Sequence, residues 1–107
     1  MIPDAPGKPE VKDINATQMS VFWTSPKSDG GSPITGYIVE QKDAESTRWS
    51  RVTKELIMDT TYEATNLKAD MEYQFRVMAE NKAGTGPASE PSDKRGRPIV
   101  FFLCYVV

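Results

Sequence analysis

The chain has 107 residues, which is enough for one domain and too few for two. Hydrophobic residues make up 38% and charged residues 26% of the sequence, a balance typical of a soluble globular domain. The net charge of −2 argues against nucleic acid or an anionic membrane as a partner. The sequence contains no histidine, which excludes imidazole-based catalytic triads, and Cys104 alone cannot form an internal disulfide. Composition therefore argues against an enzyme, and no cofactor or metal site is expected.

Apolar and polar residues alternate in several short runs, which predicts half-buried β-strands. The clearest runs are Met19–Thr24, Ile34–Lys42 and Tyr73–Glu80, and the weaker ones are Pro9–Ile14, Thr47–Lys54 and Thr60–Thr65. No proline occurs from Ile34 to Gly86, as expected for paired strands, because proline cannot donate to a β-ladder.

Polar turns separate these runs, at Ser25–Pro33, Asp43–Ser46, Lys68–Asp70 and Asn81–Gly86. The spacing corresponds to seven short strands with no helical period. Two sheets must pack together, because a lone sheet would leave one apolar face in water. The sequence therefore predicts an all-β, seven-stranded antiparallel sandwich with a core of Trp23, Tyr37, Val39, Leu67, Tyr73, Phe75 and Val77. The expected organisation is an N-terminal linker over residues 1–8, the domain over 9–95 and a C-terminal tail over 96–107.

The run from Leu67 to Tyr73 (L-K-A-D-M-E-Y) leads into the sixth expected strand. Leu67 is expected to plug the bottom of the core, and the Tyr73 hydroxyl is placed to bond back to backbone in the connection, as in a tyrosine corner. With P-x-x-P near the start and N-x-x-G after the sixth strand, this set resembles a fibronectin type III domain over about Pro6–Ser92. The resemblance implies an immunoglobulin-like β-sandwich, although the cysteine pair of a true immunoglobulin domain is missing.

Three longer runs resemble the type III modules of giant muscle proteins, a group that includes titin, which is the first candidate, twitchin and myosin-binding protein C. The runs are Asp29–Glu40, Arg48–Val52 and Phe75–Ser92. This resemblance implies a non-catalytic cytoplasmic module of the sarcomeric A-band, a mechanical spacer and docking surface along the thick filament. The implied partners are neighbouring immunoglobulin-like or type III domains and myosin, and the isolated module is expected to be monomeric. The resemblance is also compatible with a Ser/Thr kinase domain elsewhere in the parent chain.

Candidate chemistry is sparse. The carboxylate pairs Asp43/Glu45 and Asp70/Glu72 lie in polar turns, where solvated acids are expected, so they do not predict a catalytic pair. Basic residues gather at Arg48, Arg51 and Lys54 around the fourth expected strand, and at Lys94, Arg95 and Arg97 near the end. Each group can be a contact for an acidic partner surface or a solvated strand face and linker. The first group is the candidate partner contact.

Two features keep a second class of function open. Asn15-Ala16-Thr17 matches the N-glycosylation pattern, and Ile99–Val107 is a run of nine apolar residues, too short for a bilayer span of about 20 residues. The run could begin a membrane helix, begin the first strand of a next domain, or reflect an unusual end of the reading frame. The alternative function is a module of an adhesion or signalling receptor on the extracellular side of the plasma membrane. We expect the tail to add nothing to the sandwich.

Overall fold

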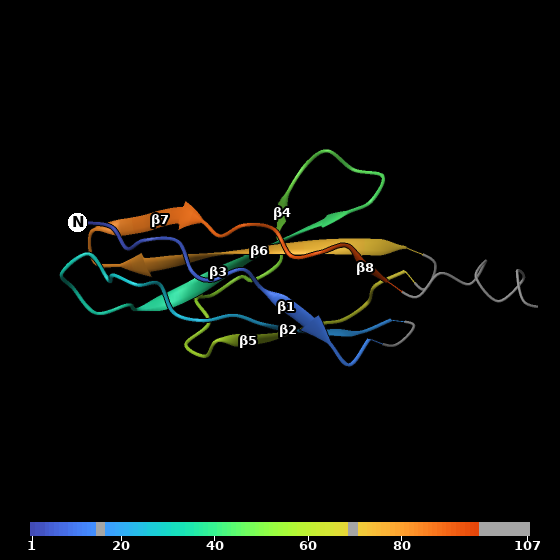
Figure 1. Cartoon of the computed structure of the whole chain (residues 1–107), viewed down its shortest axis with the longest axis horizontal. Helices are drawn as coiled ribbons and strands as arrows, with labels where there is room; N and C mark the ends of the chain where they lie inside the picture. Colours follow the sequence, from blue (N-terminus) through green and yellow to red (C-terminus); the bar gives the residue numbers. More distant parts are fainter. Residues whose placement is uncertain (15–16, 69–70, 97–107) are drawn as a thin grey trace, which may run out of the picture.

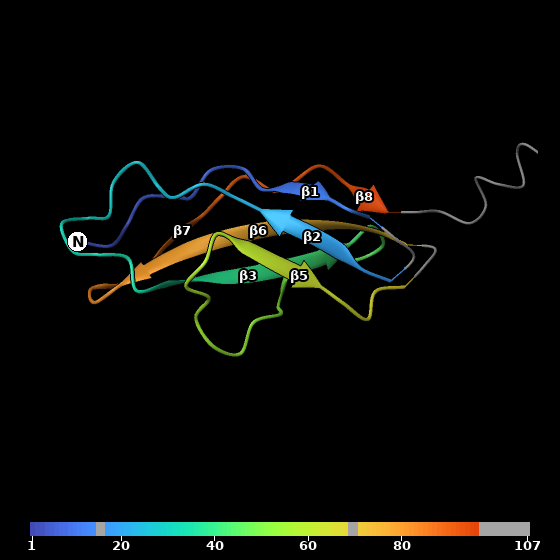
Figure 2. The ribbon, with the colours of Figure 1, turned by 90° about the horizontal axis from the view of Figure 1, so that it is seen from below.

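The computed structural model describes residues 1–14, 17–68 and 71–96, and it shows two antiparallel sheets packed face to face (Figure 1). The smaller sheet has the order β1-β2-β5, with β1 at Glu10–Lys12, β2 at Met19–Phe22 and β5 at Thr61–Ala64. The larger sheet has the order β4-β3-β6-β7, with β3 at Gly36–Asp43, β4 at Ser50–Arg51, β6 at Glu72–Asn81 and β7 at Gly84–Ala88. In Figure 2 the smaller sheet lies in front of the larger one.

The predicted all-β sandwich is confirmed, with a small difference in its last strand. The region after β6 forms β7 and the two-residue strand β8, Arg95–Gly96, and both pair with β6. Between them the pairing continues irregularly, because the Ser89 and Ser92 hydroxyls accept hydrogen bonds from the backbone N–H groups of Val77 and Phe75, at 2.9 Å each.

The long β3–β6 pair forms the centre of the larger sheet. Its register runs over eight residue pairs, from Gly36 opposite Glu80 to Asp43 opposite Tyr73. Strand alternation sends every second side chain inward, where Phe75 and Val77 are 0% exposed. From the smaller sheet, Trp23 packs edge-to-face on Tyr37, with ring centroids 5.5 Å apart. The residues expected in the core are all buried: Trp23, Tyr37, Val39, Leu67, Tyr73, Phe75 and Val77.

The connection before β6 is closed by the Tyr73 hydroxyl. This oxygen accepts a hydrogen bond from the backbone N–H of Lys68 at 2.8 Å. The neighbouring N–H of Leu67 donates to the carbonyl of Thr17 at 3.0 Å. Asn66, directly before these two residues, adopts a left-handed conformation with φ of 58°, which turns the chain into this connection. The geometry is that of a tyrosine corner.

The edge of β3 that faces β4 is paired less regularly than the sequence predicts. A strand was expected over Thr47–Lys54, but the ladder is limited to Ser50–Arg51. Beyond it, Val52 donates its N–H to the Val39 carbonyl, and the Thr53 hydroxyl accepts from the Val39 N–H. A side-chain oxygen therefore replaces a backbone partner, and this ends the regular strand.

Residues 1–8, expected as a linker, lie against the sandwich. The N–H of Asp4 donates to the Ser28 carbonyl at 3.0 Å, and that of Gly7 donates to the Thr24 carbonyl at 3.1 Å. The Asn81 side-chain amide donates to the Met1 carbonyl at 2.7 Å. Pro3 is among the most deeply buried residues. The N-terminus lies at one end of the elongated domain and β8 lies toward the other (Figure 1).

Some features singled out in the sequence lie outside the described residues. They are Asn15 and Ala16 of the glycosylation pattern, Asp70, Arg97 and the tail Ile99–Val107. Within the described ranges, no helix has the length and apolar character needed to span a membrane.

Candidate interaction surface

The predicted partner contact lies along the free edge of the larger sheet. Arg48, Arg51 and Lys54 are all exposed there. The Arg51 side chain turns back onto its own segment, donating from Nε to the Thr53 carbonyl at 2.6 Å and from Nη2 to the Lys54 carbonyl at 3.5 Å. Arg51 therefore holds the irregular turn after β4, while Arg48 and Lys54 extend from either side of it.

A second group of residues, not singled out from the sequence, adjoins this edge on the outer face of the larger sheet. The Arg76 guanidinium carbon lies 4.6 Å from the centroid of a Trp49 ring, and Lys42 Nζ lies 5.5 Å from one. Arg76 also donates from Nε to Glu40 Oε1 at 2.7 Å. We call Glu40, Lys42, Trp49 and Arg76 the outer-face cluster.

Strand register explains why the cluster forms. Side chains directly opposite one another in an antiparallel pair share a face. Glu40 is opposite Arg76 on β6 and opposite Arg51 on β4, so all three side chains leave the sheet on its outer side. The sequence shows alternation on each strand but gives no register between residues 36 positions apart. Only the pairing of β3 with β6 could have revealed this contact.

The cluster is partly desolvated. The Arg76 and Glu40 side chains are 31% and 20% exposed. A cation against an indole ring contributes about 0.5–1 kcal/mol at exposed sites and more when desolvated. The planar guanidinium suits both the ring and the carboxylate, so the same side chain makes both contacts. The arrangement contains no pair of groups suited to proton transfer.

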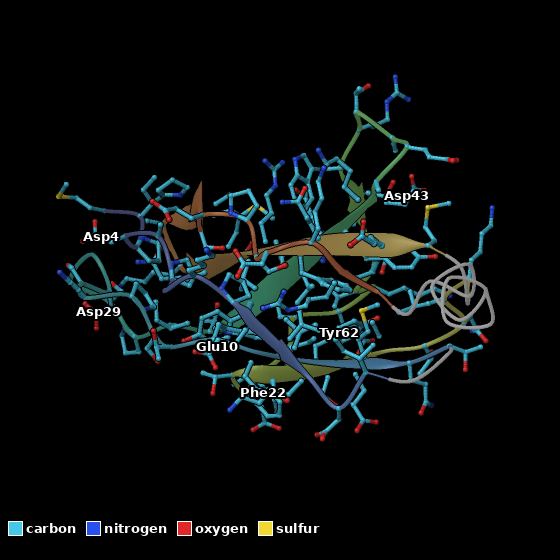
Figure 3. The ribbon with its side chains drawn as sticks, turned by 45° about the vertical axis from the view of Figure 1, so that its right-hand side comes forward. Asp4, Glu10, Phe22, Asp29, Asp43 and Tyr62 are labelled. Atoms are coloured by element: carbon cyan, nitrogen blue, oxygen red, sulfur yellow. The ribbon has the colours of Figure 1, made fainter. Side chains whose placement is uncertain are left out.

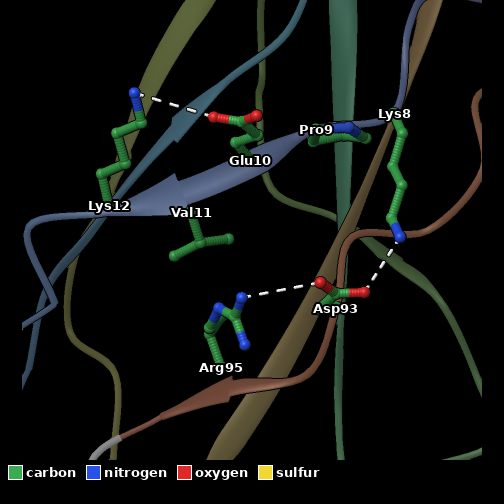
Figure 4. Close-up of a pocket in the computed structure, with 7 residues that line it drawn as sticks. All are labelled: Lys8, Pro9, Glu10, Val11, Lys12, Asp93 and Arg95. Carbon is green, nitrogen blue, oxygen red and sulfur yellow. Dashed lines mark hydrogen bonds and ion pairs between the residues drawn. The ribbon is translucent and has the colours of Figure 1, made fainter.

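Of the second basic group, Arg95 lies elsewhere, beside a groove of about 340 Å³ between β1 and the segment around β8 (Figure 4). Lys8 Nζ contacts Asp93 Oδ1 at 2.9 Å, and Arg95 Nη2 contacts Asp93 Oδ2 at 3.5 Å. The hydrogen bond and the charge of Lys8 lower the pKa of Asp93. Asp93 is therefore ionised at neutral pH, which is the opposite of what a general acid requires.

The carboxylates that could have suggested catalysis have structural roles or stand apart. Asp43 lies at the end of β3, where the loop toward β4 leaves the sheet (Figure 3). Its Oδ1 accepts a hydrogen bond from the Glu45 N–H at 3.0 Å, which is an Asx turn. Burial raises the pKa of Tyr62 on the smaller sheet. Among the described residues, no group of three or more acidic, histidine or cysteine side chains could hold a metal ion.

Fold and tyrosine corner together define the class of protein, and sequence comparison agrees. The family model "Fibronectin type III domain" matches residues 4–95, so the chain belongs to the fibronectin type III family. Human cardiac-type myosin-binding protein C is 38% identical over 100 residues, covering 91% of this chain and 8% of that protein. Titin of Drosophila melanogaster is 40% identical over 87 residues, covering 81% of this chain and, to the nearest per cent, 0% of that protein. This chain therefore spans less than a tenth of these relatives.

Solved structures give the same result. Titin domains A168–A170 superpose with a TM-score of 0.85 and 42% identity, covering 91% of this chain and 32% of that one. The twitchin kinase region from C. elegans gives a TM-score of 0.83 and 32% identity, covering 92% and 17%. The resemblance to modules of titin, twitchin and myosin-binding protein C is confirmed.

Proposed function

We propose that this chain is a non-catalytic structural module of a giant muscle protein, a mechanical spacer and docking surface along the thick filament. The observation that carries the proposal is the similarity to titin and to myosin-binding protein C over more than four fifths of this chain. On this proposal the module is cytoplasmic, lies in the sarcomeric A-band, and is monomeric in isolation. Its neighbours are immunoglobulin-like or type III domains.

The spacer role is supported by where the chain enters and leaves the described domain. The N-terminal segment lies at one end and β8 lies toward the other, so tension on the chain runs along the strands (Figure 1). The N-terminal segment is fixed by the hydrogen bonds of Asp4 and Gly7. The long β3–β6 ladder lies between the two attachment points and has eight residue pairs.

The docking role is supported by the exposed cations Arg48 and Lys54 on the free edge of the larger sheet. Because one relative is a myosin-binding protein, myosin is the first partner to test. Solved relatives include "Titin kinase and its flanking domains", at 39% identity and a TM-score of 0.87. A Ser/Thr kinase domain elsewhere in the parent chain is therefore part of the proposal, while this module contributes no catalytic group.

The alternative is a receptor or adhesion module. Domains FN1–FN3 of chicken CNTN1 superpose with a TM-score of 0.79, covering 90% of this chain and 33% of that one, at 28% identity. The fold alone therefore does not decide between the two classes, and the identity to CNTN1 is well below the 42% of the titin domains. Sequence similarity favours the muscle module.

Co-sedimentation with myosin filaments tests the proposal. The purified chain should pellet with the filaments, and the bound fraction should fall as salt screens surface charge. Arg48→Glu with Lys54→Glu should reduce pelleting, whereas Lys27→Glu with Lys82→Glu changes the net charge equally at other exposed sites and should reduce it less. The absence of pelleting with filaments in excess would contradict the docking role. An N-glycan on Asn15 of the endogenous protein would contradict the cytoplasmic location.

A further inference from the structure

Trp49 occupies a position that the fold itself does not require. The two sheets pack their inner faces together, with the core between them. Trp49 contacts Lys42 and Arg76, whose side chains leave the opposite, outer face of the larger sheet. A half-buried tryptophan beside a partly buried arginine is the composition typical of interface hot spots rather than of solvated sheet surfaces.

We propose that the outer-face cluster is a recognition site for an acidic polypeptide segment, with Trp49 and Arg76 as its anchors. The inference rests on the proposed docking function and names the surface and the chemistry of its partner. It also moves the centre of the expected contact away from Arg51, whose side chain is hydrogen-bonded to the carbonyls of Thr53 and Lys54. The new centre is the adjoining outer face of the larger sheet.

The cluster is organised before any partner arrives. The Arg76 guanidinium is held on one side by Glu40, at 2.6 and 2.7 Å, and also lies against the Trp49 ring. Lys42 Nζ also lies over the Trp49 side chain. Side chains that are already fixed lose less rotamer freedom on binding, so more of the contact free energy appears as affinity.

Local charge selects an acidic partner. None of the ion pairs among the described residues involves Lys42, Arg48, Arg51 or Lys54. Within the cluster, the Glu40 carboxylate is already paired with Arg76. Strand alternation also puts Glu72 and Glu80 on the outer face of β6, four residues to either side of Arg76. The nearby Asp43 is opposite Tyr73 in the ladder and so belongs to the inner side. The part of the outer face around Trp49 and the adjoining edge therefore carry positive charge outside the ion pairs of the described residues, on a chain whose net charge is −2.

The same charges favour a short polypeptide over a nucleic acid. A long polyanion meets the field of the whole molecule, which is negative, whereas a short acidic segment meets mainly the local cations within about a Debye length, ~8–10 Å. Met78 lies on this face opposite Ile38 and is half-buried, whereas Ile38 is buried at 7% exposure. Met78 offers apolar contact next to the cations, as a segment that mixes acidic and apolar side chains would require.

Nuclear magnetic resonance with a short poly-L-glutamate peptide tests the site directly. The chain has two tryptophans, and Trp23 is buried in the core at 5% exposure. Titration should shift the indole N–H signal of Trp49 and the Nε–H signal of Arg76, and leave that of Trp23 in place. Trp49→Ala should weaken binding by about tenfold or more, as expected for a hot-spot residue.

Two matched variants keep the test valid if Trp49→Ala unfolds. Lys42→Gln with Arg48→Gln removes one cation of the cluster and one of the adjoining edge, whereas Lys27→Gln with Lys82→Gln removes two exposed cations elsewhere. Only the first pair should weaken peptide binding markedly. Equal weakening by both pairs, shifts centred on Lys8 and Arg95, or equal affinity for a heparin fragment of the same charge would overturn the site.

Repeating the pelleting assay with myosin separates this inference from the proposed function. If myosin binds and Trp49→Ala has no effect on pelleting, the cluster is not the docking surface, although the muscle function stands. If the peptide binds at Trp49 and myosin does not pellet the chain, the site stands and the proposed docking to myosin is wrong. Loss of both peptide and myosin binding in Trp49→Ala, with the fold intact, supports both.

Discussion

The two faces of the β3–β6 pair share one backbone ladder and differ in everything else. On the inner face, Val39, Phe75 and Val77 are 0% exposed. On the outer face, Glu40 and Arg76, which are their neighbours in sequence, form an ion pair next to Trp49. Burial of a large apolar side chain contributes about 1.5–3 kcal/mol, whereas exposed ion pairs contribute about 0–1 kcal/mol. The inner face thus holds the fold together, and the outer face is free to bind a partner.

The largest effect should come from the core. Trp23→Ala should lower the free energy of unfolding by about 3–5 kcal/mol, because it removes the ring that packs on Tyr37 and leaves a cavity. Chemical denaturation measures this value. The adjacent Phe22, which is 37% exposed, is the matched control, and Phe22→Ala should cost less than about 1 kcal/mol. Equal losses for the two variants would break the distinction between inner and outer faces.

A smaller effect should follow from one buried hydrogen bond. Tyr73→Phe should cost about 1–3 kcal/mol, because the Lys68 N–H loses its acceptor in a part-buried connection. Thermal unfolding of the variant measures the loss. Tyr62→Phe is the control, since no hydrogen bond to its hydroxyl is seen among the described residues, and it should change stability by less than about 0.5 kcal/mol. An unchanged melting temperature for Tyr73→Phe would show that the corner does not stabilise the fold.

The docking of the N-terminal segment can be broken at a single glycine. A Cβ atom on Gly86 would lie 2.1 Å from the Pro3 carbonyl oxygen, so Gly86→Ala should displace the segment at a cost of about 1–3 kcal/mol. Amide hydrogen exchange should show faster exchange at Asp4 and Gly7, which donate to the Ser28 and Thr24 carbonyls. In a chain lacking residues 1–8, the same substitution should have almost no further effect. A full additional loss there would place the strain within β7.

The smallest effect should come from the exposed Lys8–Asp93 pair. Because Lys8 lowers the pKa of Asp93 in the folded state, the pair stabilises fully above the unfolded pKa, and its contribution is lost as pH falls through the folded value. Lys8→Gln should therefore differ from the unmodified chain at neutral pH and converge with it in acid, below about pH 4. Titration of the Asp93 carboxyl by nuclear magnetic resonance should show a higher pKa in Lys8→Gln. An unchanged pKa would show that the pair does not form in solution.

Sequence reasoning reached the inner face because alternation on a single strand is a local signal. Tyr73, Phe75 and Val77 follow one another at every second position, and the core position of such a run depends only on that period. The Tyr73 hydroxyl could be placed because its partner lies a few residues away in the same connection. Local information was sufficient for the fold and its core.

The outer face depends on information that a single strand does not carry. Arg76 contacts Glu40 only because of the β3–β6 register. Trp49 contacts side chains of both strands from an irregular edge, where the regular strand is two residues long and not the eight expected. The N-terminal segment was also expected as a linker, because its prolines indicate an extended chain but not a surface for it to lie on. Non-local contacts decide all three features, so the sequence analysis singled out only the adjoining edge residues Arg48, Arg51 and Lys54, and their role as a partner contact stays a prediction.

The most direct test compares two adjacent residues of β6, Arg76 on the outer face and Val77 on the inner one. Val77→Ala should lower the free energy of unfolding by about 1.5–3 kcal/mol and leave poly-L-glutamate binding unchanged. Arg76→Gln should lower stability by about 1 kcal/mol or less and weaken peptide binding by about tenfold. This crossed pattern, measured by chemical denaturation and peptide titration on the same two variants, is the result we predict. Two variants that lose stability and binding in parallel would contradict the division between a folding face and a binding face.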